Sequence, residues 1–160
     1  MKVYQLVAAQ ELPISLETAW DFFSNPANLP RITPPWLGFR VESTLPPRMY
    51  PGMVAWYKVM LLGIIPTTWV TEIPVVQEPF FFIDEQRFGP YKLWYHQHRF
   101  EAITLADGRP GVRVTDDVTY IMPFGIFGRL VHFFVVRHQL ADIFRFRERV
   151  LAELFSVETA

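Results

Sequence analysis

A long stretch without proline ends this chain and constrains its fold more than any other feature. After Pro123 no proline occurs, and apolar residues recur there at helical spacing: Leu140, Ile143, Phe144, Leu151, Leu154 and Phe155. This pattern predicts one long helix from about residue 125 to about Phe155. A helix with an apolar stripe must bury that stripe, so the rest of the chain has to supply a complementary apolar surface.

Strand-like runs separated by turn residues precede this helix. Apolar and β-branched residues alternate in the runs 37–45, 54–62, 67–76, 80–88, 91–105 and 112–122, with turn signals such as Gly89-Pro90 and Asp107-Gly108 between them. A further strand at 3–12 is followed by two short helices, which Ser15 and Asn25 can cap. We therefore predict an α+β fold in which a curved antiparallel sheet of about seven strands wraps around the terminal helix.

The composition fits a single folded domain over residues 1–160. Hydrophobic residues make up 51% and charged residues 19%, which favours a packed core over disorder. The net charge of -1 gives no electrostatic basis for binding nucleic acid, and the lack of cysteine excludes disulfides and thiolate chemistry. The apolar runs 60–65 and 130–136 are far shorter than the ~20 residues of a membrane span. With no signal-peptide pattern at the start, we expect a cytoplasmic protein without stable membrane insertion.

The run Tyr-Lys-Leu-Trp-Tyr-His-Gln-His-Arg-Phe at 91–100 carries the most informative side chains. Because side chains alternate along a strand, Trp94, His96, His98 and Phe100 share one face with Lys92. A face that mixes large aromatics with two imidazoles suits the wall of a semi-enclosed pocket. We therefore predict an internal, aromatic-rich cavity between the sheet and the terminal helix.

A hairpin turning near Gly108 extends this polar face to the next strand. At a register in which paired residue numbers sum to about 214, His98 faces Asp116 and Trp94 faces Tyr120. A carboxylate beside an imidazole raises its pKa, and it can also fix one tautomer for acid–base work. His98 and Asp116 are therefore the candidate catalytic pair. The same residues can instead contact a ligand without catalysis or form a polar ladder that only shapes the pocket.

The sequence does not decide which residues of the strand before Gly89-Pro90 face inward. A tight turn places Glu85 inward, whereas a bulge or a longer turn brings in Asp84 and Gln86. Trp56 falls on the middle hairpin, in the core or on the cavity wall. The expected ligand-binding residues are Trp94, His96, His98, Phe100, Asp116, Tyr120, Gln86 and Trp56.

Metal binding is a more specific alternative role for the two histidines. Two His at i and i+2 on a twisted strand can reach one ion. The other histidines, His132 and His138, fall on the predicted terminal helix, away from such a site. We therefore expect no metal and no cofactor.

Four segments resemble a known superfamily. They are Leu-Pro-Arg-Ile-Thr-Pro-Pro-Trp at 29–36, Asp-Glu-Gln at 84–86, Gly-Pro-Tyr with Trp-Tyr-His-Gln-His-Arg-Phe between 89 and 100, and Asp-Asp-Val-Thr-Tyr with Pro-Phe-Gly between 116 and 125. The chain resembles, over essentially its whole length, an uncharacterised bacterial subgroup of the SRPBCC (START-like, birch-pollen-allergen-like) superfamily. The resemblance implies the helix-grip fold but no single function, because carriers, polyketide cyclases and hydrolases share that scaffold.

These observations favour binding or transport of a small hydrophobic ligand that is aromatic, polyketide-like or lipid-like. The alternative is a polyketide cyclase/dehydratase-like enzyme with a His–Asp acid/base pair; an interaction protein acting through the terminal helix is the third. Residues 127–136 are apolar nearly all round and need cover. We favour burial of these residues against the pocket floor together with a homodimer contact. A membrane surface is another way to bury them. On the same helix, Arg137, Arg145, Arg147 and Arg149 are expected to face solvent.

Overall fold

The structure is a computed structural model that describes residues 1–61 and 63–156. Within these residues seven strands form one antiparallel sheet in the order β1-β7-β6-β5-β4-β3-β2. The strands are β1 (Val3–Leu12), β2 (Arg40–Val41), β3 (Met53–Leu61), β4 (Ile65–Gln77), β5 (Phe81–Phe88), β6 (Leu93–Thr104) and β7 (Pro110–Ile121). The predicted sheet is therefore confirmed, although Leu62, the predicted end of one strand, lies outside the described residues.

Helical segments occupy two places in the chain. After β1 come α1 (Leu16–Phe23) and the 3-10 helices η1 (Pro26–Ile32) and η2 (Pro35–Leu37). Both predicted caps are present: the Ser15 hydroxyl accepts from the Thr18 backbone N–H at 3.1 Å, and Asn25 Oδ1 accepts from that of Ala27 at 3.0 Å. After β7 come α2 (Gly125–Val131), the π-helical turn η3 (His132–Val136) and α3 (Arg137–Ser156).

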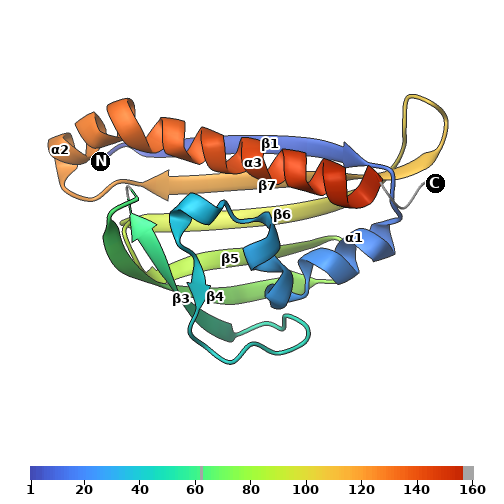
Figure 1. Cartoon of the computed structure of the whole chain (residues 1–160), viewed down its shortest axis with the longest axis horizontal. Helices are drawn as coiled ribbons and strands as arrows, with labels where there is room; N and C mark the ends of the chain where they lie inside the picture. The colour runs from blue at the N-terminus through green and yellow to red at the C-terminus, as the bar shows by residue number, and fades with distance from the viewer. Residues whose placement is uncertain (62, 157–160) are drawn as a thin grey trace.

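The C-terminal helix lies across one face of the sheet. Figure 1 shows α3 running along the sheet on the side of β1 and β7, with α1 and η1 beside it over the same face. The prediction of one long helix is correct in extent, but η3 interrupts it with a wider turn. In the described residues no helix is both long and apolar enough to cross a membrane.

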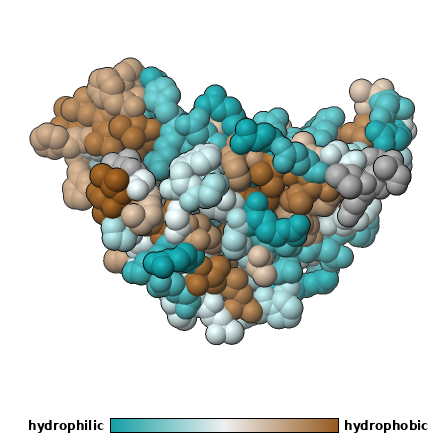
Figure 2. Space-filling view, viewed as in Figure 1, coloured by the Kyte–Doolittle hydropathy of each residue, from teal (hydrophilic) through white to brown (hydrophobic). Residues whose placement is uncertain are grey.

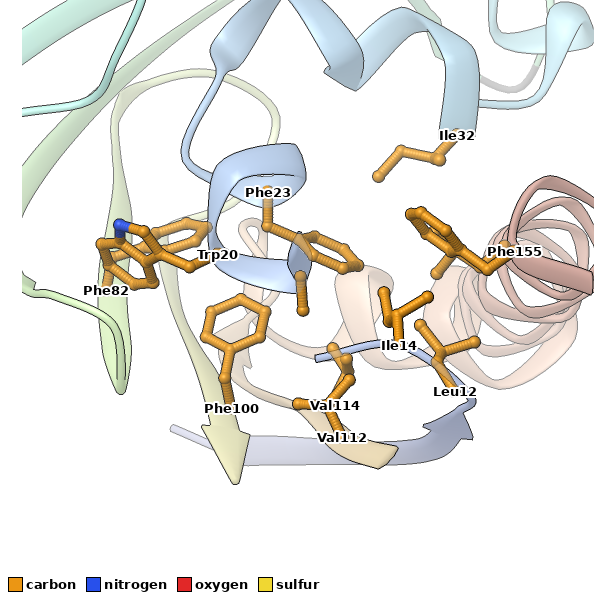
Figure 3. Packing of buried hydrophobic residues seen from close by; sticks show 12 residues of the cluster. Leu12, Ile14, Trp20, Phe23, Ile32, Phe82, Phe100, Val112, Val114 and Phe155 are labelled. Carbon is orange, nitrogen blue, oxygen red and sulfur yellow. The ribbon is translucent and has the colours of Figure 1, made fainter. Parts of the chain in front are cut away.

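One end of the space between sheet and helix is filled by aromatic packing. Trp20 and Phe23 of α1 meet Phe82 and Phe100 of the sheet and Phe155 of α3 (Figure 3). The Trp20 and Phe100 rings lie edge to face with centroids 5.7 Å apart. This packing closes the α1 end of the fold.

The predicted strand at 37–45 is wrong in length, because only Arg40–Val41 pair with β3. Leu37 belongs to η2, which ends at Gly38 with a φ of 52°. Beyond the strand, the Ser43 hydroxyl accepts from the Trp56 N–H at 3.1 Å and donates to its carbonyl at 3.4 Å. The Glu42 N–H also donates to the Trp56 carbonyl at 3.1 Å, so one backbone bond and the Ser43 side chain together end the pairing at this edge.

Candidate functional site

A cavity of about 240 Å³ lies between the sheet and α3. Most of its wall is apolar and comes from β3 to β6, α1, η1 and α3. Trp69, Tyr91 and Trp94 form an aromatic corner, in which the Trp69 and Trp94 rings meet nearly at right angles with centroids 5.3 Å apart. The predicted internal cavity is therefore present and is rich in aromatic side chains.

Charged side chains from four elements meet at one place on this wall. They are Asp84 of β5, His96 and His98 of β6, Asp116 of β7 and Arg147 of α3, and together we call them the His–Asp cluster. All except Asp116 line the cavity. Asp116 lies behind the imidazoles and is buried.

Each carboxylate of the His–Asp cluster bridges both imidazoles. Asp84 Oδ2 lies 3.2 Å from His96 Nδ1 and 2.8 Å from His98 Nε2. Asp116 Oδ1 lies 3.0 Å from His96 Nε2 and 2.8 Å from His98 Nδ1. The last contact is close but poorly aligned for a hydrogen bond. Arg147 Nη2, 3.4 Å from Asp116 Oδ1, ties α3 to the sheet.

Asp84, His96 and Asp116 of the cluster stay charged because groups of opposite charge lie beside them. Burial lowers the pKa of the His96 imidazole, but Asp84 and Asp116 outweigh burial and raise that pKa to about 9. Burial raises the pKa of the Asp116 carboxyl, yet Arg147 and the two imidazoles hold it well below its usual range. The pKa of Asp84 is lowered in the same way, with the two imidazoles overcoming burial. At neutral pH the cluster therefore contains an imidazolium between two carboxylates.

The predicted hairpin register holds, with His98 opposite Asp116 and Trp94 opposite Tyr120. Trp94, His96 and His98 lie on the cavity wall. Tyr120 is buried behind Trp94, and its hydroxyl meets His132 Nε2 at 2.8 Å.

Two of the predicted cavity residues do not lie on the cavity wall. Phe100 belongs to the aromatic core at the α1 end and is not on the cavity wall. Trp56 is placed wrongly by the sequence prediction, because it is 44% exposed on the other face of the sheet. Odd-numbered residues of β3 face inward, so Tyr57 lines the cavity in its place.

The open question at β5 is answered by the length of its turn. Asp84 pairs with His96 and faces inward, while Glu85 lies opposite Tyr95 and forms an ion pair with Arg87. The strands are joined by more residues than a tight hairpin needs. The Gln86 amide closes this longer turn by bonding both the carbonyl and the N–H of Tyr91, at 2.7 and 3.2 Å. Gln86 therefore shapes the turn and does not line the cavity.

Arg147 is the site residue that the sequence analysis missed. It was expected on the solvated face of the helix, but it is buried against Asp116, with its guanidinium carbon 5.3 Å from the centre of the Phe23 ring. The helical spacing could have predicted that Arg147 is buried, since position 147 falls on the stripe of Leu140, Phe144 and Leu151. An arginine on an apolar stripe indicates a buried acidic partner.

Three residues of the His–Asp cluster also form a group that could hold a metal ion. Asp84, His96 and His98 each offer one ligand atom, and these atoms lie within 4.8 Å of one another. The two imidazole rings have centroids 3.7 Å apart and are tilted by 37° to each other. A nitrogen of each ring lies beside the same oxygen of Asp84, at 3.2 and 2.8 Å, distances that are normal for hydrogen bonds and ion pairs and longer than the ~2.0–2.2 Å of bonds to zinc. The geometry therefore favours the ion-paired cluster.

Comparisons with known proteins find similar structures but no matching family model or curated sequence. A point mutant of norcoclaurine synthase from Thalictrum flavum, solved with a transition-state analogue, has a TM-score of 0.68 at 13% identity and covers 99% of this chain and 98% of its own. Major latex-like protein 151 from Panax ginseng has a TM-score of 0.63 at 14% identity, covering 96% and 97%.

A bacterial protein of known structure is equally similar. The protein TTHA0849 from Thermus thermophilus has a TM-score of 0.64 at 17% identity and covers 98% of this chain and 100% of its own. Identities this low establish the fold alone. The chain therefore has the helix-grip fold that its sequence motifs predict, the fold of the START-like and birch-pollen-allergen-like proteins.

Proposed function

We propose that this protein binds a small hydrophobic molecule in the cavity between the sheet and α3. The observation that carries this proposal is a cavity of about 240 Å³ with aromatic walls and one charged cluster. A cavity of about 150 Å³ already holds benzene, and drug-sized ligands use about 300 Å³ or more. The volume therefore suits a molecule of one or two rings.

The His–Asp cluster orients the polar group of such a ligand. Asp84, His96, His98 and Arg147 reach the cavity from three elements and are held by contacts within the His–Asp cluster, Arg147 by Asp116, before any ligand arrives. Because little side-chain freedom is left to lose, a hydroxyl or carbonyl oxygen binds there at low entropic cost. Trp94 and Trp69 supply the apolar contact area around it.

Filling the cavity tests this proposal. Naphthol, which carries two rings and one hydroxyl, is the probe, and its affinity is measured by isothermal titration calorimetry. Ile143 lines the cavity, so Ile143→Trp is expected to weaken naphthol binding by about 10-fold or more, which corresponds to ~1.4 kcal/mol. Val7→Trp, on an exposed position of β1, is the matched control and leaves binding unchanged. Equal affinity of wild type and Ile143→Trp would place the probe elsewhere and refute the proposal.

Acid–base catalysis in the same cavity is the second candidate function. Its supporting observation is that His98, the predicted acid–base residue, lies on the cavity wall between the carboxylates of Asp84 and Asp116, where an imidazole can donate a proton to a ligand oxygen. Dehydration of an aromatic β-hydroxyketone, followed by absorbance of the conjugated product, is the assay. If this candidate is right, His98→Gln slows turnover by about 100-fold or more. Gln97→Ala, on the opposite face of β6, keeps the wild-type rate. A His98→Gln variant as fast as wild type eliminates the acid–base role.

A further inference from the structure

A strongly apolar helical segment lies at one end of the molecule. Six side chains between residues 124 and 134 each expose more than half of their surface: Phe124, Ile126, Phe127, Leu130, Phe133 and Phe134. We call these six residues the α2 tip. Figure 2 shows apolar residues gathered at the end where Figure 1 places α2. Apolar patches of this kind mark sites of interaction with a protein, a ligand or a membrane.

The charges around the α2 tip are positive. Arg129 lies within this segment and Arg137 follows it, and residues 118–141 contain neither Asp nor Glu. Lys2 is brought alongside by the pairing of β1 with β7. Burial and the nearby charges of Lys2 and Arg137 lower the pKa of His132, so both cations lie close to η3. Across the described part of the chain, no carboxylate comes within ion-pair distance of Lys2, Arg129 or Arg137.

We propose that the α2 tip docks onto the surface of a membrane that contains anionic lipids. Its aromatic and aliphatic side chains enter the boundary between headgroups and acyl chains. Lys2, Arg129 and Arg137 pair with the lipid phosphates, which supply the negative charge that the protein lacks here. This inference goes beyond ligand binding and stands without it.

A second copy of the chain is the competing occupant, and it fits the charges poorly. A two-fold contact would bring the same tip from both copies together. Arg129 and Arg137 would then face their equivalents without a carboxylate to neutralise them, which disfavours association. An anionic lipid surface has the opposite sign of charge, so we favour the membrane over the dimer contact expected from the sequence.

The α2 tip also lies close to one end of the cavity. Gln139 and Leu140, in the first turn of α3 after η3, line the cavity, as does Leu61 at the end of β3. A hydrophobic ligand leaving at this end would meet lipid without crossing bulk water. Only this consequence rests on the proposed ligand-binding function.

Vesicle co-sedimentation tests the docking surface. The protein is mixed with vesicles of phosphatidylcholine alone or with about one third phosphatidylglycerol. Wild type is expected to sediment with the anionic vesicles, and added salt should weaken binding. Phe127→Ser with Phe134→Ser is expected to bind at least about 10-fold more weakly. The matched control, Val54→Ser with Trp56→Ser, removes exposed apolar side chains from β3 and keeps wild-type binding.

Three results would overturn the proposal. These are no sedimentation of wild type with anionic vesicles, equal binding by the two double variants, and a dimer that the Phe127→Ser, Phe134→Ser protein no longer forms. The last result would assign the tip to a second copy of the chain. The substituted side chains are exposed, so naphthol binding by the variant checks that its fold is intact. If wild type itself does not bind naphthol, an unchanged thermal unfolding midpoint serves as that check, and the two proposals fail separately.

Discussion

Asp116→Asn is expected to lower the free energy of unfolding by about 3–5 kcal/mol, the cost typical of breaking a buried ion pair. Asp116 Oδ1 lies within 3.4 Å of charged or chargeable groups on His96, His98 and Arg147. An amide of the same shape leaves the Arg147 guanidinium buried without its counter-charge. Asp116→Asn also weakens the contact between Arg147 of α3 and residue 116 of β7, which ties the helix to the sheet.

The neighbouring aspartate is the matched control for this variant. Asp117 lies on the opposite face of β7, 3.5 Å from the half-exposed Arg99 guanidinium, and accepts from the Gln5 side chain at 2.8 Å. Asp117→Asn is expected to cost less than about 1 kcal/mol, because exposed ion pairs contribute little. Urea denaturation measures both variants. Similar losses of unfolding free energy for the two substitutions would contradict the claim that the buried cluster stabilises the protein.

Raising the pH is expected to destabilise the protein by about 3 kcal/mol. The pKa of His96 is about 9 in the folded protein and about 6.5 in the unfolded chain, and each pKa unit corresponds to ~1.36 kcal/mol. A raised pKa stabilises fully below about pH 6.5, and this contribution is lost as the pH rises to about 9. The lowered pKa values of Asp84 and Asp116 act in the other direction, so their contribution is lost as the pH falls below about 4.

Maximum stability is therefore expected between about pH 4 and pH 6.5. The free energy of unfolding in urea, measured at a series of pH values from about 5 to about 9, gives this profile. His96→Gln should flatten the alkaline side, whereas His138→Gln, at an exposed position of α3, should leave it unchanged. A wild-type protein whose stability does not fall above about pH 6.5 would show that His96 is not held as an imidazolium.

Two elementary rules predicted most of the His–Asp cluster from the sequence. Alternation along β6 placed Trp94, His96 and His98 on one face, and the short turn at Gly108 fixed their partners on β7. Asp84 could not be placed because its parity depends on the length of the turn before β6. That length is set by the Gln86 amide and its bonds to Tyr91, a side-chain contact that no turn rule encodes.

Trp56 and Arg147 show where local pattern gives too little information. Both faces of β3 carry aromatic side chains, so hydrophobicity alone did not tell Trp56 from Tyr57. For Arg147, charge was taken to mean exposure, although its helical position is on the buried stripe. The partner that makes burial tolerable, Asp116, is far away in the sequence and is brought near only by the fold.

A crystal structure of the protein soaked with naphthol tests the ligand site most directly. We predict electron density for the two rings between Trp94 and α3, with the hydroxyl directed toward the imidazoles that Asp84 and Asp116 bridge. The opposite finding is a gap closed by packed side chains, with both imidazoles turned to bulk water and the probe only on the outer surface. That result would remove the basis for a binding protein.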